Sequence, residues 1–109
     1  EKTPEEIIEN AINEREENLS GFAKELFLGV CSHLAELDEK IAAAAENWRI
    51  ERIGKVTLAV LRLGAYELLY KPEIGMEISI NEALELTKKY DEEKAVGFVN
   101  GILGKIANA

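Results

Sequence analysis

The segment from residue 55 to residue 70 constrains the fold more than any other part of this 109-residue chain. Its apolar side chains are not confined to one stripe of a helix but recur on nearly every side. A helix with this pattern is surrounded by other helices. Lys71-Pro72 ends the segment, because a residue before proline is disfavoured in the helical region. We therefore expect a central helix in which Arg62, placed among apolar residues, forms a structural ion pair.

Two amphipathic stretches precede this segment and predict helices. The first begins at Thr3-Pro4-Glu5-Glu6, where Thr3 and Glu6 fit a capping box, and should end near Asn18. The second covers residues 19–45, with apolar residues at helical spacing. His33 falls inside its apolar stripe, so we expect a packed or hydrogen-bonded histidine rather than a metal ligand.

Further helices are predicted around and after the central segment. Residues 48–53 read as a short helix in which Trp48 is an anchor. Residues 79–82 fit a second capping box that would start a helix after a connection at 73–77, with Gly75 in a turn. Asp91 would cap the last helix, roughly 92–107. No alternation typical of a strand is present, so the sequence predicts an all-α fold with about six helices.

Size, charge and cysteine content place further limits. A chain of 109 residues is one domain, residues 1–109, and no stretch approaches 18 consecutive apolar residues, so no membrane helix is expected. The single Cys31 cannot form an internal disulfide, which fits the reducing cytoplasm. Residues 1–47 carry four basic and twelve acidic side chains, whereas residues 48–109 carry nine of each. The net charge of −8 therefore belongs to the first half and indicates a solvated acidic face.

No pattern typical of catalysis or cofactor binding is present. His33 and Cys31 lie two positions apart on the same predicted helix and so point in different directions. The spacings of common zinc sites are missing, and no glycine-rich loop follows a strand. We expect no catalytic residue, no metal and no cofactor. The chain is interpreted as a binding module rather than an enzyme.

The last predicted helix carries the candidate binding surface. Phe98 lies at one edge of its buried stripe, with Lys94 one turn before it and Lys105 two turns after it. Gly97, Gly101 and Gly104 share the adjoining face, although each costs the helix about 1 kcal/mol relative to alanine. An aromatic ring beside ammonium groups and open backbone suits single-stranded RNA. Packing of Phe98 in the core, with the glycines between helices, is the alternative.

Several blocks in the second half resemble the NusB family of bacterial transcription antitermination factors. The similarity is strong from Trp48 to Ile106 and looser over residues 19–45, and the order and spacing of the blocks match as well. Four blocks carry it: Ala59-Val60-Leu61-Arg62-Leu63, Tyr66-Glu67-Leu68, Ile80-Asn81-Glu82-Ala83 and Phe98-Val99-Asn100-Gly101-Ile102-Leu103.

The resemblance implies an all-helical fold of two small subbundles, here an acidic partial one at 1–47 and a second one at 48–109. It also implies binding of boxA RNA together with NusE, a small-subunit ribosomal protein, within the RNA polymerase antitermination complex that supports ribosomal RNA synthesis. The family's RNA contact maps to Phe98, and we assign Lys94, Lys105 and Asn100 to the same set. For Asn100, a polar contact and a hydrogen bond within the helix both remain open.

Two departures from the family pattern limit what the resemblance carries. The family's arginine-rich first helix is missing, which removes its main electrostatic attraction for RNA and would leave apolar surface for a homodimer. The position that carries an acidic contact to NusE in some relatives is Thr57 here, so Thr57 is the predicted partner contact. Two alternatives stay open: the accessory domain of a ribosomal RNA cytosine methyltransferase, although the chain ends cleanly at Ala109, and a helical interaction domain without RNA contact.

Overall fold

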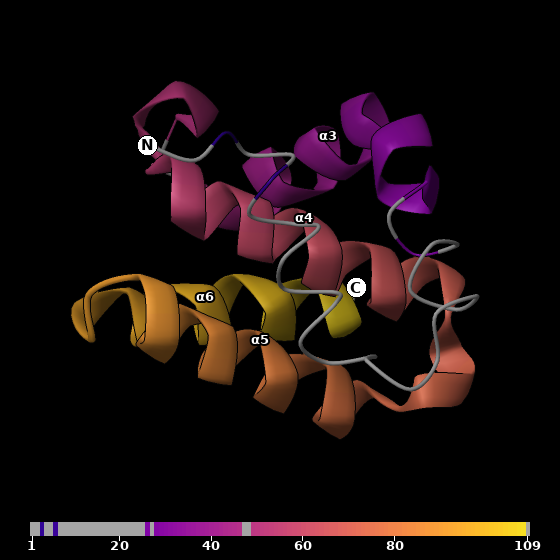
Figure 1. Ribbon diagram of the computed structural model, residues 1–109. Coiled ribbons are helices and arrows are strands. Elements are labelled where there is room, and N and C mark those ends of the chain that lie inside the picture. Colours follow the sequence, from indigo (N-terminus) through magenta and orange to yellow (C-terminus); the bar gives the residue numbers. More distant parts are fainter. Residues whose placement is uncertain (1–2, 4–5, 7–25, 27, 47–48, 109) are drawn as a thin grey trace.

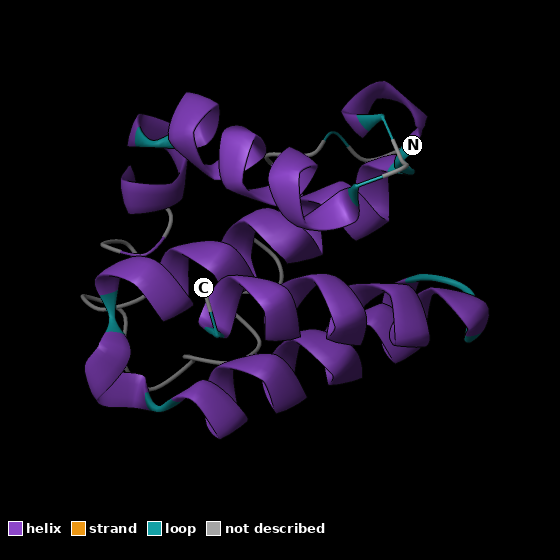
Figure 2. Cartoon of the chain, turned by 180° about the vertical axis from the view of Figure 1, so that it is seen from behind, coloured by secondary structure: helices purple, strands orange, loops and turns teal. Residues whose placement is uncertain are grey.

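The computed structural model describes residues 3, 6, 26, 28–46 and 49–108. Helices and the loops between them make up this described part, and it contains no strand (Figure 2). The predicted all-α class is confirmed there. The elements are, in chain order, α3 (Leu34–Ala45), the 3-10 helix η1 (Ile50–Arg52), α4 (Lys55–Tyr70), the 3-10 helix η2 (Pro72–Ile74), α5 (Met76–Tyr90) and α6 (Lys94–Ala107).

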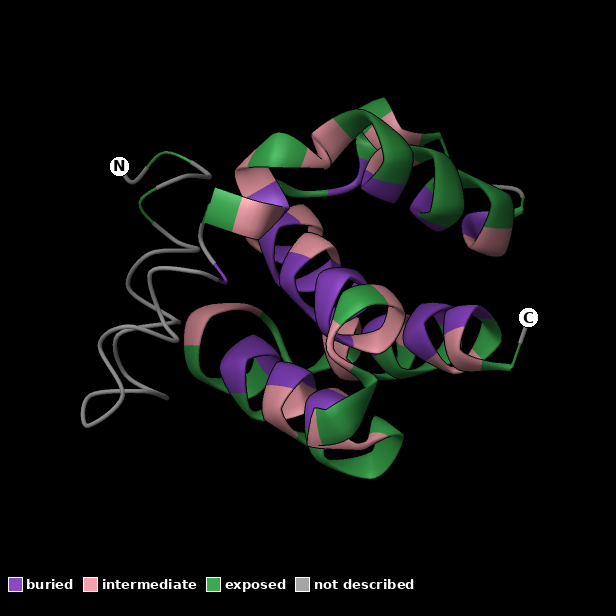
Figure 3. Cartoon of the chain, turned by 90° about the vertical axis from the view of Figure 1, so that its right-hand side faces the viewer, coloured by how far each residue is buried: buried purple, intermediate pink, exposed green. Residues whose placement is uncertain are grey.

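Helix α4 lies at the centre of the molecule, as its apolar sequence predicts. It passes between α3 on one side and the α5–α6 pair on the other (Figure 1). Figure 3 shows it buried along most of its length, and nine of its 16 residues are buried. Helix α6 also contacts both α3 and α5, so the helices around the central one are joined through α6. The core is thus organised around residues 55–70.

Two contacts fix the neighbours of α4. The Arg62 guanidinium forms two hydrogen bonds of 2.8 Å with the Asp38 carboxylate on α3, which confirms the predicted ion pair. On the opposite side α6 comes so close that a Cβ at Gly64 would lie 2.8 Å from Leu103 Cδ1. Such a distance would require the Leu103 side chain or its helix to shift, so glycine at 64 permits the close approach of Leu103 to α4.

The predictions for the first half of the chain have three different outcomes. The capping box at Thr3 is confirmed: the Glu6 N–H donates to Thr3 Oγ1 and the Thr3 N–H donates to the Glu6 carboxylate. Most of the predicted first helix, and Trp48, lie outside the described residues. The predicted continuous helix over 19–45 is wrong, because helical residues 28–32 end in a turn at His33 before α3 begins.

His33 itself explains this break. Its Nδ1 lies 2.8 Å from the carbonyl oxygen of Gly29, which would accept the His33 N–H in a continuous helix. The His33 N–H instead donates to the carbonyl of Val30, which tightens the turn. The ring packs against Tyr66 and Tyr70, at centroid distances of 5.8 and 4.5 Å. The expectation of a packed, hydrogen-bonded histidine is confirmed.

Both predicted helix starts in the second half are wrong by a few residues. Helix α5 begins at Met76, directly after Gly75, whose positive φ of 101° permits the turn from η2. Ser79 is therefore inside the helix and buried, and its hydroxyl has no hydrogen-bond partner among the described residues. Asp91 follows the end of α5 rather than capping α6, which begins at Lys94. For α5, the turn that Gly75 makes after η2 determines where the helix begins, and the capping pattern at residues 79–82 does not.

Candidate nucleic-acid interface

Phe98 lies at the edge of the buried stripe of α6. Its ring is half-buried and packs against the core, and it lines a cavity of about 450 Å³. The cavity lies between the segment that joins η1 to α4 and the first turns of α6. Its apolar and small lining residues are Ile53, Gly54, Ala95 and Phe98. Its polar lining residues are Arg52, Thr57, Asp91, Glu92 and Lys94.

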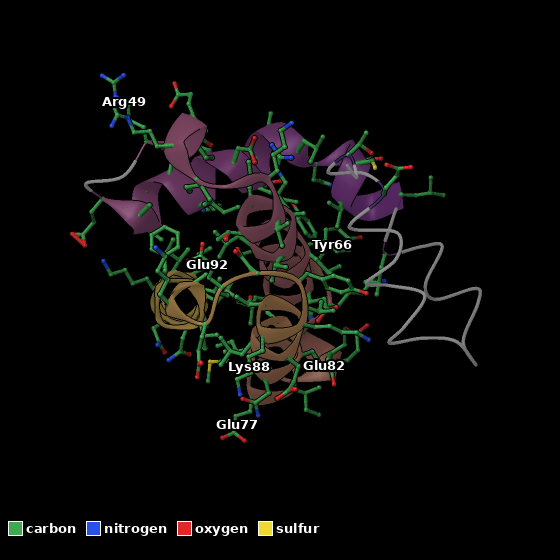
Figure 4. All side chains as sticks on the ribbon, turned by 60° about the vertical axis from the view of Figure 1, so that its left-hand side comes forward. Arg49, Tyr66, Glu77, Glu82, Lys88 and Glu92 are labelled. Carbon is green, nitrogen blue, oxygen red and sulfur yellow. The ribbon has the colours of Figure 1, made fainter. Side chains whose placement is uncertain are left out.

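The structure brings Lys94 to this cavity and leaves it accessible. Its side chain is 84% exposed and pairs with Glu92 at 3.2 Å (Glu92 is labelled in Figure 4, at the start of α6). An ion pair this exposed contributes little stability, so exchanging Glu92 for a ligand phosphate would cost little. Lys94 thus lies where the sequence placed it, beside the ring.

Arg52 is a neighbour of Phe98 that the sequence analysis did not single out. It ends η1, is exposed and lines the same cavity, and it forms no ion pair with another described residue. Arg49 and Lys55 are exposed in the same short segment, and Figure 4 shows Arg49 extending away from the body of the molecule. The recurrence of basic residues at 49, 52 and 55 was the available signal. Only the fold shows that one member of this run, Arg52, lines the cavity at the start of α6.

Lys105 lies at the other end of α6 and does not line the Phe98 cavity. Seven residues along a helix correspond to about 10 Å. Its ammonium group binds the Glu46 carboxylate and donates to the Ala44 carbonyl oxygen at 3.3 Å. The hydrogen bond from Lys105 to the Glu46 carboxylate, and then the lysine charge, hold the pKa of Glu46 below its ordinary value. Lys105 also lines a second cavity of about 540 Å³ with residues of α3.

Asn100 and Thr57 are placed very differently from Phe98. Asn100 is exposed on α6 and does not line the cavity; no hydrogen bond joins its side chain to another described residue. Thr57 lines the cavity but is only 6% exposed. Its hydroxyl donates to Asp91 Oδ2, while Asp91 Oδ1 accepts the N–H of Glu92 at 2.7 Å. Thr57 can therefore reach a ligand mainly through the Asp91 carboxylate, which the sequence analysis had read only as a cap.

The helical glycines beside Phe98 face open space. A Cβ at Gly97, Gly101 or Gly104 would meet no atom of the described residues within 4 Å. Contact with another helix of the described chain thus gives no reason for glycine at these positions. In the part of the chain that the structure describes, no three potential metal ligands come together. None of the helices in that part could span a membrane.

Comparison with known proteins shows which family this chain is related to. Residues 1–108 match the NusB family. A transcription antitermination protein NusB from Nitratidesulfovibrio vulgaris strain DP4 is 47% identical over 89 residues, which are 82% of this chain and 58% of the relative. The protein of the same name from Myxococcus xanthus is 44% identical over 97 residues, 89% of this chain and 69% of the relative. The chain thus spans about three fifths of the length of the relatives it matches.

A solved structure supports the same relationship. T. maritima NusB superposes with a TM-score of 0.79 at 29% identity, covering 96% of this chain and 88% of that chain. The predicted helical architecture is therefore that of a known protein. The resemblance in the second half of the sequence extends to the arrangement of the helices.

Proposed function

This chain belongs to the NusB family, and from that premise we propose that it is a transcription antitermination factor that binds RNA without catalysing a reaction. The observation that carries the proposal is the half-buried Phe98 ring in a cavity shared with Arg52 and Lys94. An aromatic face offers stacking to an unpaired base, worth about 1–3 kcal/mol per base. The two cations stand where the adjoining phosphates would pass.

We assign the RNA to the boxA class and the protein partner to NusE, acting with RNA polymerase in the cytoplasm to support ribosomal RNA synthesis. NusE would dock along α4 and its neighbours. The predicted contact at Thr57 would be indirect, since the Thr57 hydroxyl is bonded to Asp91. Lys105 and Asn100 would be peripheral to the RNA site, because neither lines the Phe98 cavity.

Fluorescence anisotropy with a labelled boxA RNA tests this proposal. Binding is measured with and without NusE at several salt concentrations, for the wild type, Phe98→Ala and a control variant, Ile78→Ala. Ile78 is 56% exposed on α5, outside both cavities, so its truncation removes an exposed apolar side chain without touching the site. Of the two variants, we expect only Phe98→Ala to bind the RNA more weakly than the wild type does. Equal affinities for all three proteins would remove Phe98 from the interface.

Exposed apolar side chains favour one alternative, a helical interaction domain that forms a homodimer and does not bind RNA. Leu28, Met76 and Ile78 are 52%, 48% and 56% exposed. Light scattering over a range of concentrations distinguishes the two functions when combined with the RNA titration. A concentration-dependent dimer that binds no RNA in any combination would favour this alternative. The relatives described above are named antitermination proteins, which favours the first function over a methyltransferase accessory domain.

A further inference from the structure

The Asp91 carboxylate is held in a fixed orientation in the wall of the Phe98 cavity. The Thr57 hydroxyl donates to one of its oxygens, and the Glu92 N–H donates to the other at 2.7 Å. The two donors come from separate elements, since Thr57 belongs to the first turn of α4. A carboxylate oxygen accepts more than one hydrogen bond. Both oxygens therefore keep acceptor capacity for a ligand in the cavity.

The rest of the cavity wall suits a flat, neutral group better than a phosphate. A phosphate beside Asp91 would be repelled by the carboxylate, whereas Arg52 and Lys94 at the solvent-exposed parts of the wall would attract it. Phe98 lines the cavity with an aromatic side chain, and arginine guanidinium planes also stack on bases. A volume of about 450 Å³ lies within the range of small-ligand cavities. The cavity thus combines a stacking surface with one oriented acceptor.

We propose that this cavity holds one unpaired nucleobase that carries an exocyclic amino group, and that Asp91 selects this base by accepting a hydrogen bond from the amino group. The inference rests on the proposed RNA-binding function and adds base selection to it. Cytosine donates from its N4 amino group to a carboxylate. Uracil presents a carbonyl oxygen at the same ring position, which would face the carboxylate without a hydrogen. Thr57 is a positioning residue in this arrangement, because it acts through Asp91.

Affinities for two RNA homopolymers, a cytidine 12-mer and a uridine 12-mer, test the proposal directly. The two bases have similar ring size, so the ratio of affinities isolates the hydrogen-bonding edge from stacking and charge. We expect the wild type to bind the cytidine oligomer about five- to tenfold more tightly. In Asp91→Ala both acceptors are lost, so the ratio should fall to about one. In Asp91→Asn one acceptor becomes a donor and one remains, so the ratio should fall only in part.

Three further variants control for charge and for folding. Glu93→Gln removes a negative charge from an exposed neighbour outside the cavity, so it should raise both affinities equally and keep the ratio. Thr57→Val removes the hydroxyl that orients Asp91 and should lower the ratio, whereas Thr57→Ser keeps the hydroxyl and should restore it. Circular dichroism and thermal melting verify that each variant is folded before its ratio is compared.

The outcomes separate this inference from the function it rests on. If boxA RNA binds but the wild type shows no preference for cytidine, or if Asp91→Ala keeps the preference, base selection by Asp91 is wrong and the RNA-binding function stands. If Asp91→Asn weakens only the complex with NusE, the carboxylate contacts a protein and the inference is overturned. If no RNA binds under any condition, both proposals fall together.

Discussion

The two ends of α6 have similar features but differ in the groups that line their cavities. Each end has a lysine paired with a glutamate and a cavity of roughly similar volume, about 450 Å³ at the start and about 540 Å³ at the end. The first cavity contains an aromatic ring, Arg52 and an oriented carboxylate. The second is lined by two alanines, two aliphatic side chains, two lysines and a glutamate, with Lys105 bound to Glu46 and to the α3 backbone. A lysine at helical spacing therefore does not by itself mark a binding site.

The largest expected change in RNA affinity comes from removing the Phe98 ring. Phe98→Ala should weaken RNA binding by about 5- to 150-fold, which corresponds to the loss of about 1–3 kcal/mol from one stacked base. Lys105→Ala, measured in the same anisotropy titration, should change the affinity much less. If Lys105→Ala has the larger effect, the binding surface lies at the other end of α6.

A smaller effect should distinguish the cations at the two ends. Arg52→Ala removes a charge beside the Phe98 cavity that no other described residue pairs with, and it should reduce the slope of log affinity against log salt by about one unit. Lys105→Ala should leave that slope nearly unchanged, because the lysine is already paired with Glu46. The measurement is the RNA affinity at four or more salt concentrations. Equal slopes for wild type and Arg52→Ala would exclude a phosphate contact at Arg52.

The glycines allow a comparison in which stability and binding change in opposite directions. Gly97→Ala and Gly104→Ala should each stabilise the fold by up to about 1 kcal/mol, since a Cβ meets no described atom and alanine is the better helix former. Denaturant unfolding measures this gain. Only Gly97→Ala, one residue from Phe98, should also weaken RNA binding. Unchanged RNA binding by Gly97→Ala would show that the RNA backbone does not need this glycine.

The smallest expected effect is a pH dependence at the end of α6. Because Lys105 lowers the pKa of Glu46 in the folded state, this pair stabilises the fold above the ordinary value of 4.5 and loses its contribution as the pH falls through the lowered pKa. The difference in Tm between the wild type and Lys105→Met should thus be small and positive at neutral pH and should disappear in acid. A difference that persists at pH 2 would assign the stabilisation to packing of the lysine stem.

Local pattern predicted the helices well and their ends less well. The apolar run of α4, the Arg62 ion pair and the position of Phe98 at the stripe edge all follow from composition and helical periodicity. The starts of α5 and α6 do not follow from local pattern. Helix α5 begins directly after Gly75, and Asp91 ends α5, although both capping patterns fit the sequence.

The candidate site was predictable only in part, for a physical reason. Phe98 and Lys94 are neighbours on one helix, so their proximity is encoded locally. The bond from Thr57 to Asp91 spans 34 residues, and the bond from Lys105 to Glu46 spans 59. Contacts of this kind depend on how the helices cross, which periodicity does not specify. The division of the chain near residue 47 also stays a prediction, because residues 47–48 lie outside the described part.

The contact between Gly64 and Leu103 couples two positions that are distant in the sequence. A side chain larger than hydrogen at 64 would require either the Leu103 side chain or α6 itself to shift. Since Phe98 and Lys94 are carried on that same helix, such a displacement would also alter the distance from the ring to Arg52. An evolutionary exchange at the buried position 64 that displaced α6 would therefore change the shape of the Phe98 cavity as well as the packing of the core.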